Sequence, residues 1–369
     1  MTSHPLPACI DDLNAEWLSH ALSSALGPDA SVAAFQATVI GEGVGFLGEL
    51  GRVELTYAGT PADGAPASVV VKLPTREPQP RALATTMGLY EREVGFYREL
   101  AETSGARVPR VYHAAFEPSS GGFALVMEDV RNARLGNQLA SCSLDEARLV
   151  ITALAKLHAR WWESPKLDTY TWLPASAAHP FFQVMRMGYE QSLPVFLDRY
   201  ADAFDPVVRR CAEGLSAGWD HFMAPLFTRQ RTLCHGDYRL DNLLFGTPGT
   251  EDELVMLDWQ LCLGASATND LQYFISGNLR PEVIDQETEG LLDLYHETLA
   301  GCGVHQYSRS QLGAEYREAS LLQVLRLVLG AAAIDPETYD ERGHEVLQVL
   351  FGGFAGSLVR YEADQYLPA

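Results

Sequence analysis

The residues with the clearest chemical potential lie in one short segment, His235-Gly-Asp-Tyr-Arg-Leu-Asp-Asn242. On a tight loop, the side chains of Asp237 and Asn242 can point toward one ligand cluster. A carboxylate can accept a proton from an attacking hydroxyl, and an amide oxygen can coordinate a hard cation such as Mg²⁺. The alternative is a structural turn, in which Asp237 bonds its own backbone and Asn242 caps the next strand. Both interpretations are compatible with the segment taken alone.

A second carboxylate, Asp258, follows the short apolar run Val255–Leu257. An Asp at the end of a strand is by itself more often a turn residue. Here it comes soon after the His235–Asn242 segment, where a second oxygen ligand for Mg²⁺ belongs. The spacing therefore favours a metal site made from Asn242 and Asp258.

Glycines recur in the segment Gly41-Glu-Gly43-Val-Gly45-Phe-Leu-Gly48. Gly43, Gly45 and Gly48 form a literal G-x-G-x-x-G. A dinucleotide-binding fingerprint requires a helix to follow, but residues 50–57 alternate as a strand, which argues against a Rossmann dehydrogenase. A strand, a glycine turn and a second strand instead predict a lid whose backbone N–H groups cover a triphosphate. A plain hairpin turn is the alternative.

Lys72 is one of only three lysines in a chain that otherwise uses arginine. A compact ammonium can lie against α- and β-phosphates where a planar guanidinium is too wide. Such a lysine needs a carboxylate to hold it, and the predicted helix Thr85–Leu100 offers Glu93 or Glu91. Glu93 shares a face with the apolar residues of that helix, so it is preferred, although either acid could be an ordinary surface charge.

These residues need a scaffold, and the periodicity of the chain predicts two kinds of domain. The N-terminal part reads as an antiparallel sheet with one helix, and the part after Asp129 reads as mainly helical. We expect domains at residues 1–129 and 130–369. Strands are expected within 34–57 and at 68–72, 108–111, 123–127, 242–245 and 254–257, a proline-rich loop at 77–80, and helices at 85–100, 143–162, 181–200, 204–222, 283–300, 311–332 and 342–361.

Composition excludes several classes of protein. The 369 residues are 47% hydrophobic and 20% charged, which is typical of a globular chain. Lys plus Arg number 27 and Asp plus Glu 48, and the resulting net charge of −21 argues against nucleic acid as a partner. The six cysteines are scattered without a C-x-x-C pair, so neither a zinc site nor a disulfide scaffold is expected. No secretory signal is visible near the start, and the longest apolar stretch, 321–334, is too short to span a membrane. We expect a cytoplasmic protein.

Four motifs follow one another along the chain: the glycine segment, Lys72, the His235–Asn242 segment and Asp258. In this order they resemble the aminoglycoside phosphotransferase/choline kinase family. The closest branch resembles the ecdysteroid kinase-like group, through Lys156-Leu-His158-Ala, His235–Asn242, and Asp258-Trp-Gln260 followed by Asn269-Asp270-Leu. The resemblance covers roughly residues 35–280. It implies an α+β, bilobal protein-kinase-like fold with a small sheet lobe and a larger helical lobe. It also implies ATP- and Mg²⁺-dependent phosphorylation of a small-molecule hydroxyl.

The resemblance also implies roles for individual residues. Asp237 is the expected catalytic base, and Asn242 and Asp258 are the expected Mg²⁺ ligands. Lys72, paired with Glu93, is expected to bind the nucleotide phosphates under the glycine segment (Gly41, Gly43, Gly45). The residues Met127, Glu128 and Asp129 are expected to form the hinge that faces adenine. Asp270 and His158 match positions that buttress the catalytic loop.

The acceptor is less constrained than the chemistry. Three features argue against protein substrates. Gly236 precedes Asp237, Trp259-Gln260 follows Asp258, and the chain lacks an A-P-E ending. Nine aromatic residues within 161–200 either wall a pocket for a flat apolar alcohol or belong to a helix core. We therefore rank a bulky apolar alcohol, such as a steroid or polyketide, above an aminoglycoside and choline. A catalytically silent, nucleotide-binding pseudokinase is the alternative function, and the oligomeric state is left open.

Overall fold

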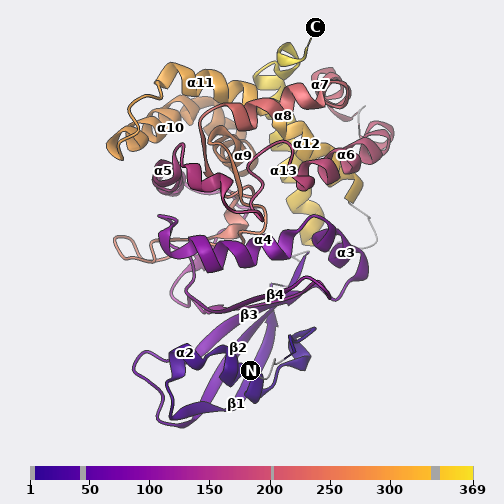
Figure 1. Cartoon of the computed structure of the whole chain (residues 1–369). Coiled ribbons are helices and arrows are strands. Elements are labelled where there is room, and N and C mark those ends of the chain that lie inside the picture. Colours follow the sequence, from indigo (N-terminus) through magenta and orange to yellow (C-terminus); the bar gives the residue numbers. More distant parts are fainter. Residues whose placement is uncertain (1–4, 42–46, 201–202, 334–340, 369) are drawn as a thin grey trace. The chain divides into compact units, whose positions relative to one another are not determined.

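The structure is a computed structural model that describes residues 5–41, 47–200, 203–333 and 341–368. The chain divides into two compact units (Figure 1). Unit 1 consists of Met1–Thr103 and Arg107–Ala133, and unit 2 of Ser104–Ala106 and Arg134–Ala369.

Unit 1 is built on an antiparallel sheet of five strands in the order β1-β2-β3-β5-β4. Its apolar face packs against the helix α1 (Ala15–Ala21), where Trp17 and Leu18 meet Val53, Val69 and Val71 in one buried cluster. The alternation of buried and exposed residues along β2 is the pattern expected of a strand with one face in the core. The strands are β1 (Ala30–Ile40), β2 (Gly48–Gly59), β3 (Ser68–Pro74), β4 (Val111–Glu117) and β5 (Gly122–Glu128).

The helical part of unit 1 differs from the sequence expectation. Instead of a loop at 77–80 and one helix from 85, the chain forms α3 (Pro78–Thr86), α4 (Leu89–Gly95) and a π-helical turn (Phe96–Leu100). Proline suits the first turn of a helix, so Pro78 begins α3 rather than preventing it. Gly88 separates the two helices because its φ of +66° is in the left-handed region, which glycine adopts without strain.

Unit 2 is mainly helical. The sequence Ser143-x-x-Glu146 has the pattern of a capping box, and the structure forms it, with Ser143 and Glu146 each bonding the other's backbone at the start of α5. The helix α9 was not predicted, because all its residues are buried and it therefore lacks an amphipathic period. The helices are α5 (Leu144–Trp161), α6 (Pro180–Arg199), α7 (Pro206–Ala217), α8 (Trp219–Thr228), α9 (Thr268–Asn278), α10 (Pro281–Gly301), α11 (Arg309–Glu318), α12 (Gln323–Ala333) and α13 (Glu341–Arg360).

Two small sheets lie among these helices. One pairs β7 (Arg231–Cys234) with β10 (Leu263–Ser266), and the other joins β6 (Arg134–Leu135), β8 (Leu243–Phe245) and β9 (Leu254–Met256). The strands predicted near 242 and 254 are β8 and β9, whereas β7 and β10 were missed. These short strands fix both ends of the His235–Asn242 segment.

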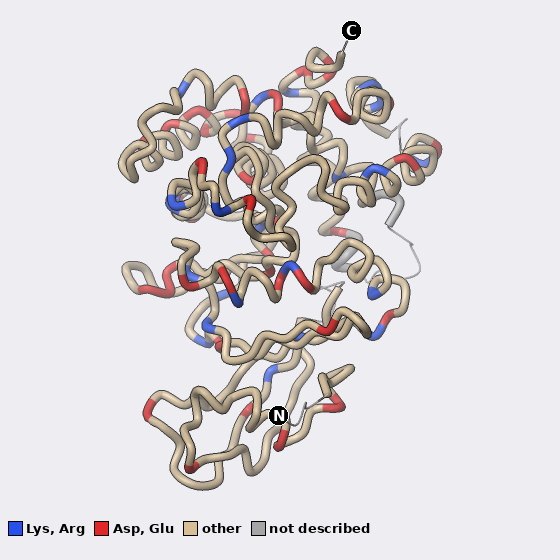
Figure 2. Tube along the Cα trace, in the orientation of Figure 1, with Lys and Arg blue, Asp and Glu red and all other residues tan. Residues whose placement is uncertain are grey.

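Acidic residues are spread over both units rather than gathered in one block, as Figure 2 shows. Among the described residues, no helix is both long and apolar enough to cross a membrane.

Candidate active site

The His235–Asn242 segment is a loop between β7 and β8 whose first turn is held from below by α9. Asp270 of α9 accepts hydrogen bonds from the backbone N–H groups of His235 and Gly236, at 2.5 and 2.9 Å. The Nε2 atom of His158 lies 3.5 Å from the same carboxylate, and both side chains are fully buried. The loop therefore rests on a buried carboxylate.

The backbone at Gly236 requires glycine. Its φ is +83°, and a Cβ atom there would lie 2.0 Å from the carbonyl oxygen of Leu261. No L-residue fits this position without moving the neighbouring chain. This explains physically why the chain has glycine, and not arginine, before Asp237.

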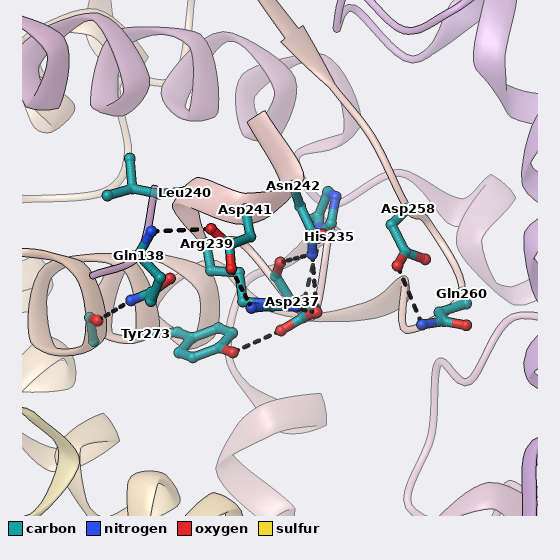
Figure 3. Close-up of polar contacts among 12 residues, drawn as sticks. Gln138, His235, Asp237, Arg239, Leu240, Asp241, Asn242, Asp258, Gln260 and Tyr273 are labelled. Carbon is teal, nitrogen blue, oxygen red and sulfur yellow. Dashed lines mark hydrogen bonds and ion pairs between the residues drawn. The ribbon is translucent and has the colours of Figure 1, made fainter. Parts of the chain in front are cut away.

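The carboxylate of Asp237 is bound by three side chains (Figure 3). The Tyr273 hydroxyl donates to Oδ1 at 2.6 Å, and the Asn242 amide nitrogen donates to Oδ2 at 2.9 Å. Arg239 Nε also donates to Oδ2, at 3.3 Å. The Asp237 side chain is 16% exposed, so a ligand can reach it.

These contacts set the charge of Asp237. Burial by itself raises the pKa of the Asp237 carboxyl, but the charge of Arg239 and the hydrogen bond from Tyr273 outweigh it. The net pKa therefore lies below its ordinary value, and Asp237 is ionised at neutral pH. An ionised carboxylate can orient a hydroxyl and accept its proton.

The backbone brings Asn242 and Asp258 together. The N–H of Leu257, the residue before Asp258, donates to the Asn242 carbonyl at 2.9 Å, and the Leu257 carbonyl accepts from His235 Nε2 at 2.8 Å. Asp258 itself has a φ of +62°, which turns the chain sharply after β9. The Gln260 amide donates to its Oδ2 at 3.3 Å. The two candidate metal ligands, Asn242 and Asp258, therefore lie on segments that are hydrogen-bonded to each other.

Unit 1 contains the candidate phosphate-binding pair. Lys72 lies in β3, between β2 and β5 in the sheet. Its Nζ atom is 2.8 Å from Oε1 of Glu93 in α4, and the two side chains are 8% and 1% exposed. Glu91, the other acid considered from the sequence, is exposed. The pair joins two elements that are distant in sequence.

Only part of the predicted glycine segment lies within the residues that the structure describes. Gly43 and Gly45 lie outside the described residues. Gly41, the residue after β1, has a φ of +73°, and Gly48 begins β2. Tyr90 of α4 donates its hydroxyl to the Leu47 carbonyl at 2.7 Å, which fixes the end of this segment to the same helix that carries Glu93.

The predicted hinge residues lie at the end of β5, and two of their side chains are in ion pairs. Glu128 contacts Arg107 at 3.0 Å. The Asp129 carboxylate, 2% exposed, is bound by Arg52 and Arg131. Their side chains stabilise unit 1, so any contact with adenine at these two positions has to come from the backbone.

The aromatic residues of 161–200 are largely core. Five of these nine aromatic residues are buried, which supports the helix-core interpretation for them. These five are Trp161, Phe181, Phe182, Tyr189 and Phe196.

Sequence reasoning missed the residues that α9 and α12 bring to the loop. Tyr273 is bound to Asp237, and the guanidinium carbon of Arg326 lies 4.4 Å from the centre of the Tyr273 ring. Tyr273 follows the Asn269-Asp270-Leu motif closely, but nothing in its spacing signals a contact with Asp237. Such contacts depend on how the helices pack.

Residues 42–305 match the model of the ecdysteroid kinase-like family. The chain belongs to this family. The match spans both units and includes Lys72, Glu93, the His235–Asn242 loop and Asp258. The resemblance inferred from the sequence is thereby confirmed, and so is its classification as a small-molecule kinase with a hydroxyl acceptor. A search of curated proteins found no match.

Solved structures support the kinase-like fold of this family member. A protein from Ralstonia eutropha, suggested to be an aminoglycoside phosphotransferase, is 15% identical with a TM-score of 0.58, over 96% of this chain and 99% of that one. Aminoglycoside 2′-phosphotransferase-IIIa, bound to GDP, is 15% identical with a TM-score of 0.53, over 92% and 98%. Choline kinase from Streptococcus pneumoniae is 16% identical with a TM-score of 0.51, over 92% and 98%. The predicted α+β, protein-kinase-like fold is confirmed.

Proposed function

We propose that the chain is an ATP- and Mg²⁺-dependent phosphotransferase that phosphorylates a hydroxyl of a small molecule, with Asp237 as the catalytic base. The observation that carries this proposal is the Asp237 carboxylate, partly exposed and held by Tyr273, Asn242 and Arg239. Phosphoryl transfer asks a protein mainly to position its reactants and neutralise charge. A carboxylate fixed at both oxygens and still accessible suits that task.

Asp237 receives the acceptor hydroxyl. The carboxylate orients that hydroxyl toward the phosphoryl group and takes up its proton as the new O–P bond forms. Arg239 supports this role, because it binds both Asp237 and Asp241, each at 3.3 Å, and fixes the two carboxylates of the loop.

Asn242 and Asp258 are the proposed ligands of Mg²⁺. The amide nitrogen of Asn242 is occupied by two hydrogen bonds to Asp237, while its Oδ1 accepts none from any described residue. The Asn242 amide oxygen and the Asp258 carboxylate are ligand types that Mg²⁺ prefers. The bound ion would supply positive charge to the phosphates.

Lys72, held by Glu93, is the proposed partner of the α- and β-phosphates. The buried ion pair keeps the ammonium in place, and its compact charge suits phosphate oxygens. We further propose that Gly41, Gly43 and Gly45 cover the phosphates and that the backbone of Met127–Asp129 meets adenine. The family match covers all these residues except Gly41.

For the acceptor, we propose a bulky apolar alcohol, such as a steroid or polyketide, ahead of an aminoglycoside or choline. Four of the nine aromatic residues within 161–200 are not buried, which leaves some of them available to line a pocket: Trp162, Tyr170, Trp172 and Tyr200.

The test is an assay of ADP release and of phosphorylated product by mass spectrometry, with a panel of steroids, polyketides, aminoglycosides and amino alcohols. Phosphorylation of at least one alcohol, dependent on both ATP and Mg²⁺, is the expected result. Tight binding of Mg-ATP with no ADP release and no product across the panel would favour the pseudokinase instead. Parallel reactions with GTP define the nucleotide preference.

A further inference from the structure

Arg326 of α12 is an arginine that lies beside the catalytic loop without a carboxylate partner. Among the described residues, no Asp or Glu oxygen comes within ion-pair distance of its guanidinium. Its hydrogen bonds go to neutral oxygens, from Nη2 to Asn269 Oδ1 at 3.1 Å and to the Gly236 carbonyl at 3.5 Å, and from Nη1 to Gln323 Oε1 at 3.4 Å. An arginine in a protein interior is normally paired with an acid, because removing a cation from water is costly.

A neighbouring arginine shows the difference. Arg239 lies in the loop itself, and the carboxylates of Asp237 and Asp241 accept its hydrogen bonds. Burial lowers the pKa of Arg326, whereas at Arg239 the nearby carboxylates outweigh burial and raise the pKa. The Arg326 guanidinium remains charged. Because a guanidinium has five N–H donors, some of them remain for an anionic partner.

The position of Arg326 places it on the acceptor side of Asp237. Oδ2 of Asp237 is bound to Asn242, the proposed metal ligand, while Oδ1 is bound to Tyr273. In Figure 3, Tyr273 and Asp258 lie on opposite sides of Asp237. The Arg326 guanidinium packs on the Tyr273 ring, at 4.4 Å from its centre. Since in-line transfer brings the acceptor and the nucleotide from opposite sides of the phosphoryl group, the Oδ1 side is that of the acceptor.

We propose that Arg326 binds an oxyanion that the acceptor carries a few bonds from its reacting hydroxyl, so that the acceptor is a hydroxy acid rather than an amino alcohol. This inference rests on the proposed phosphotransfer at Asp237. A guanidinium binds a carboxylate through two parallel N–H···O bonds, which fixes the orientation of the neighbouring hydroxyl as well as adding affinity. The same charge repels an ammonium group at that place.

Three matched alcohols test the inference: 3-hydroxy-3-phenylpropanoate, its methyl ester, and 3-amino-1-phenylpropan-1-ol. They share one secondary alcohol and differ in charge. Binding is measured by calorimetry with the native chain, Arg326→Gln, Arg326→Lys and, as a control, Arg360→Gln. Arg360 is another partly buried arginine of unit 2, paired with Asp285 far from the loop in sequence.

The native chain is expected to bind the acid about 10- to 100-fold more tightly than the ester, and the amine most weakly. Arg326→Gln should remove that preference and leave binding of the ester within about twofold, Arg326→Lys should restore part of it, and Arg360→Gln should behave as the native chain. The inference is overturned if the native chain does not bind the acid, or if Arg326→Gln binds the acid as tightly as the native chain does. ADP release is followed in parallel: a chain that prefers the acid through Arg326 but transfers no phosphate contradicts the proposed function, while the oxyanion-binding site at Arg326 is retained.

Discussion

Asp237 and Asp270 belong to two regions of unit 2 that meet at the same loop, and their hydrogen-bond partners differ in kind. Asp270, beneath the loop, is fully buried; it accepts the backbone N–H groups of His235 and Gly236, and the side chains of Asn269 and His158 also contact it. Asp237, at the loop's open side, is partly exposed and accepts side-chain donors from Tyr273, Asn242 and Arg239.

This difference between the donors of Asp270 and Asp237 indicates that one carboxylate serves the stability of the fold and the other serves the activity. Backbone donors cannot move away when a carboxylate is removed, so the loss of Asp270 leaves buried N–H groups unpaired. Side-chain donors can turn to water, and an exposed carboxylate can still bind a ligand. We therefore expect changes at Asp270 to affect the free energy of unfolding and changes at Asp237 to affect turnover.

The largest effect is expected for Asp237→Asn. The amide keeps the shape of the side chain but cannot take up a proton, so kcat should fall by about 10²–10⁴-fold. Binding of Mg-ATP and the melting temperature should change little. Steady-state ADP release and calorimetry check both points, and full residual turnover would remove Asp237 from the mechanism.

Asp270→Ala should reduce the free energy of unfolding by about 2–5 kcal/mol, because two buried N–H groups lose their acceptor. Urea denaturation followed by circular dichroism measures this loss. Asp145→Ala is the control, since the Asp145 side chain is 94% exposed and its removal should cost about 0.5 kcal/mol or less. Equal stability of the two variants would contradict the role given to Asp270.

Tyr273→Phe should have a smaller effect on turnover than Asp237→Asn. The change removes one of three side-chain donors to Asp237 and keeps the ring under Arg326. We expect kcat to fall by about 5- to 20-fold, with KM for ATP unchanged. A fall as large as that of Asp237→Asn would mean that Tyr273 takes part in the reaction directly.

The smallest effect concerns pH. Burial by itself raises the pKa of Asp270, but the neighbouring His158 side chain and the Gly236 N–H outweigh it, so the folded pKa is lowered. Ionised Asp270 thus stabilises the fold above its unfolded pKa of about 4, and this contribution is lost as the pH falls through the folded value. Melting temperatures of the native chain and Asp270→Asn should converge below about pH 4. A constant difference down to pH 3 would contradict the lowered pKa.

Local patterns predicted the elements whose signals are local. The capping box at Ser143, the alternation of β2 and the helix face that carries Glu93 each follow from residues close in sequence. The family motifs likewise located the loop and Asp258. The α+β fold followed from the change from alternating to helical periodicity near residue 130.

The remaining features depend on tertiary packing. A helix buried on all sides, such as α9, carries no amphipathic signal. Neither the helix that carries Tyr273 nor the contact of Tyr273 with Asp237 could therefore be predicted. The start of α3 was missed because Pro78 and Pro80 were assigned to a loop, although proline is favoured in a first turn. The position of Arg326 requires α12 to pack beside the loop, which no spacing encodes.

The central claim is that Asn242 and Asp258 hold the metal while Asp237 acts on the acceptor. The most direct test is the binding of Mn²⁺, followed by electron paramagnetic resonance, in the presence of a non-hydrolysable ATP analogue. The account predicts that Asp258→Asn weakens Mn²⁺ binding by at least about 10-fold, whereas Asp237→Asn changes it by about twofold or less. Unchanged binding in Asp258→Asn, or a larger loss in Asp237→Asn, would contradict it.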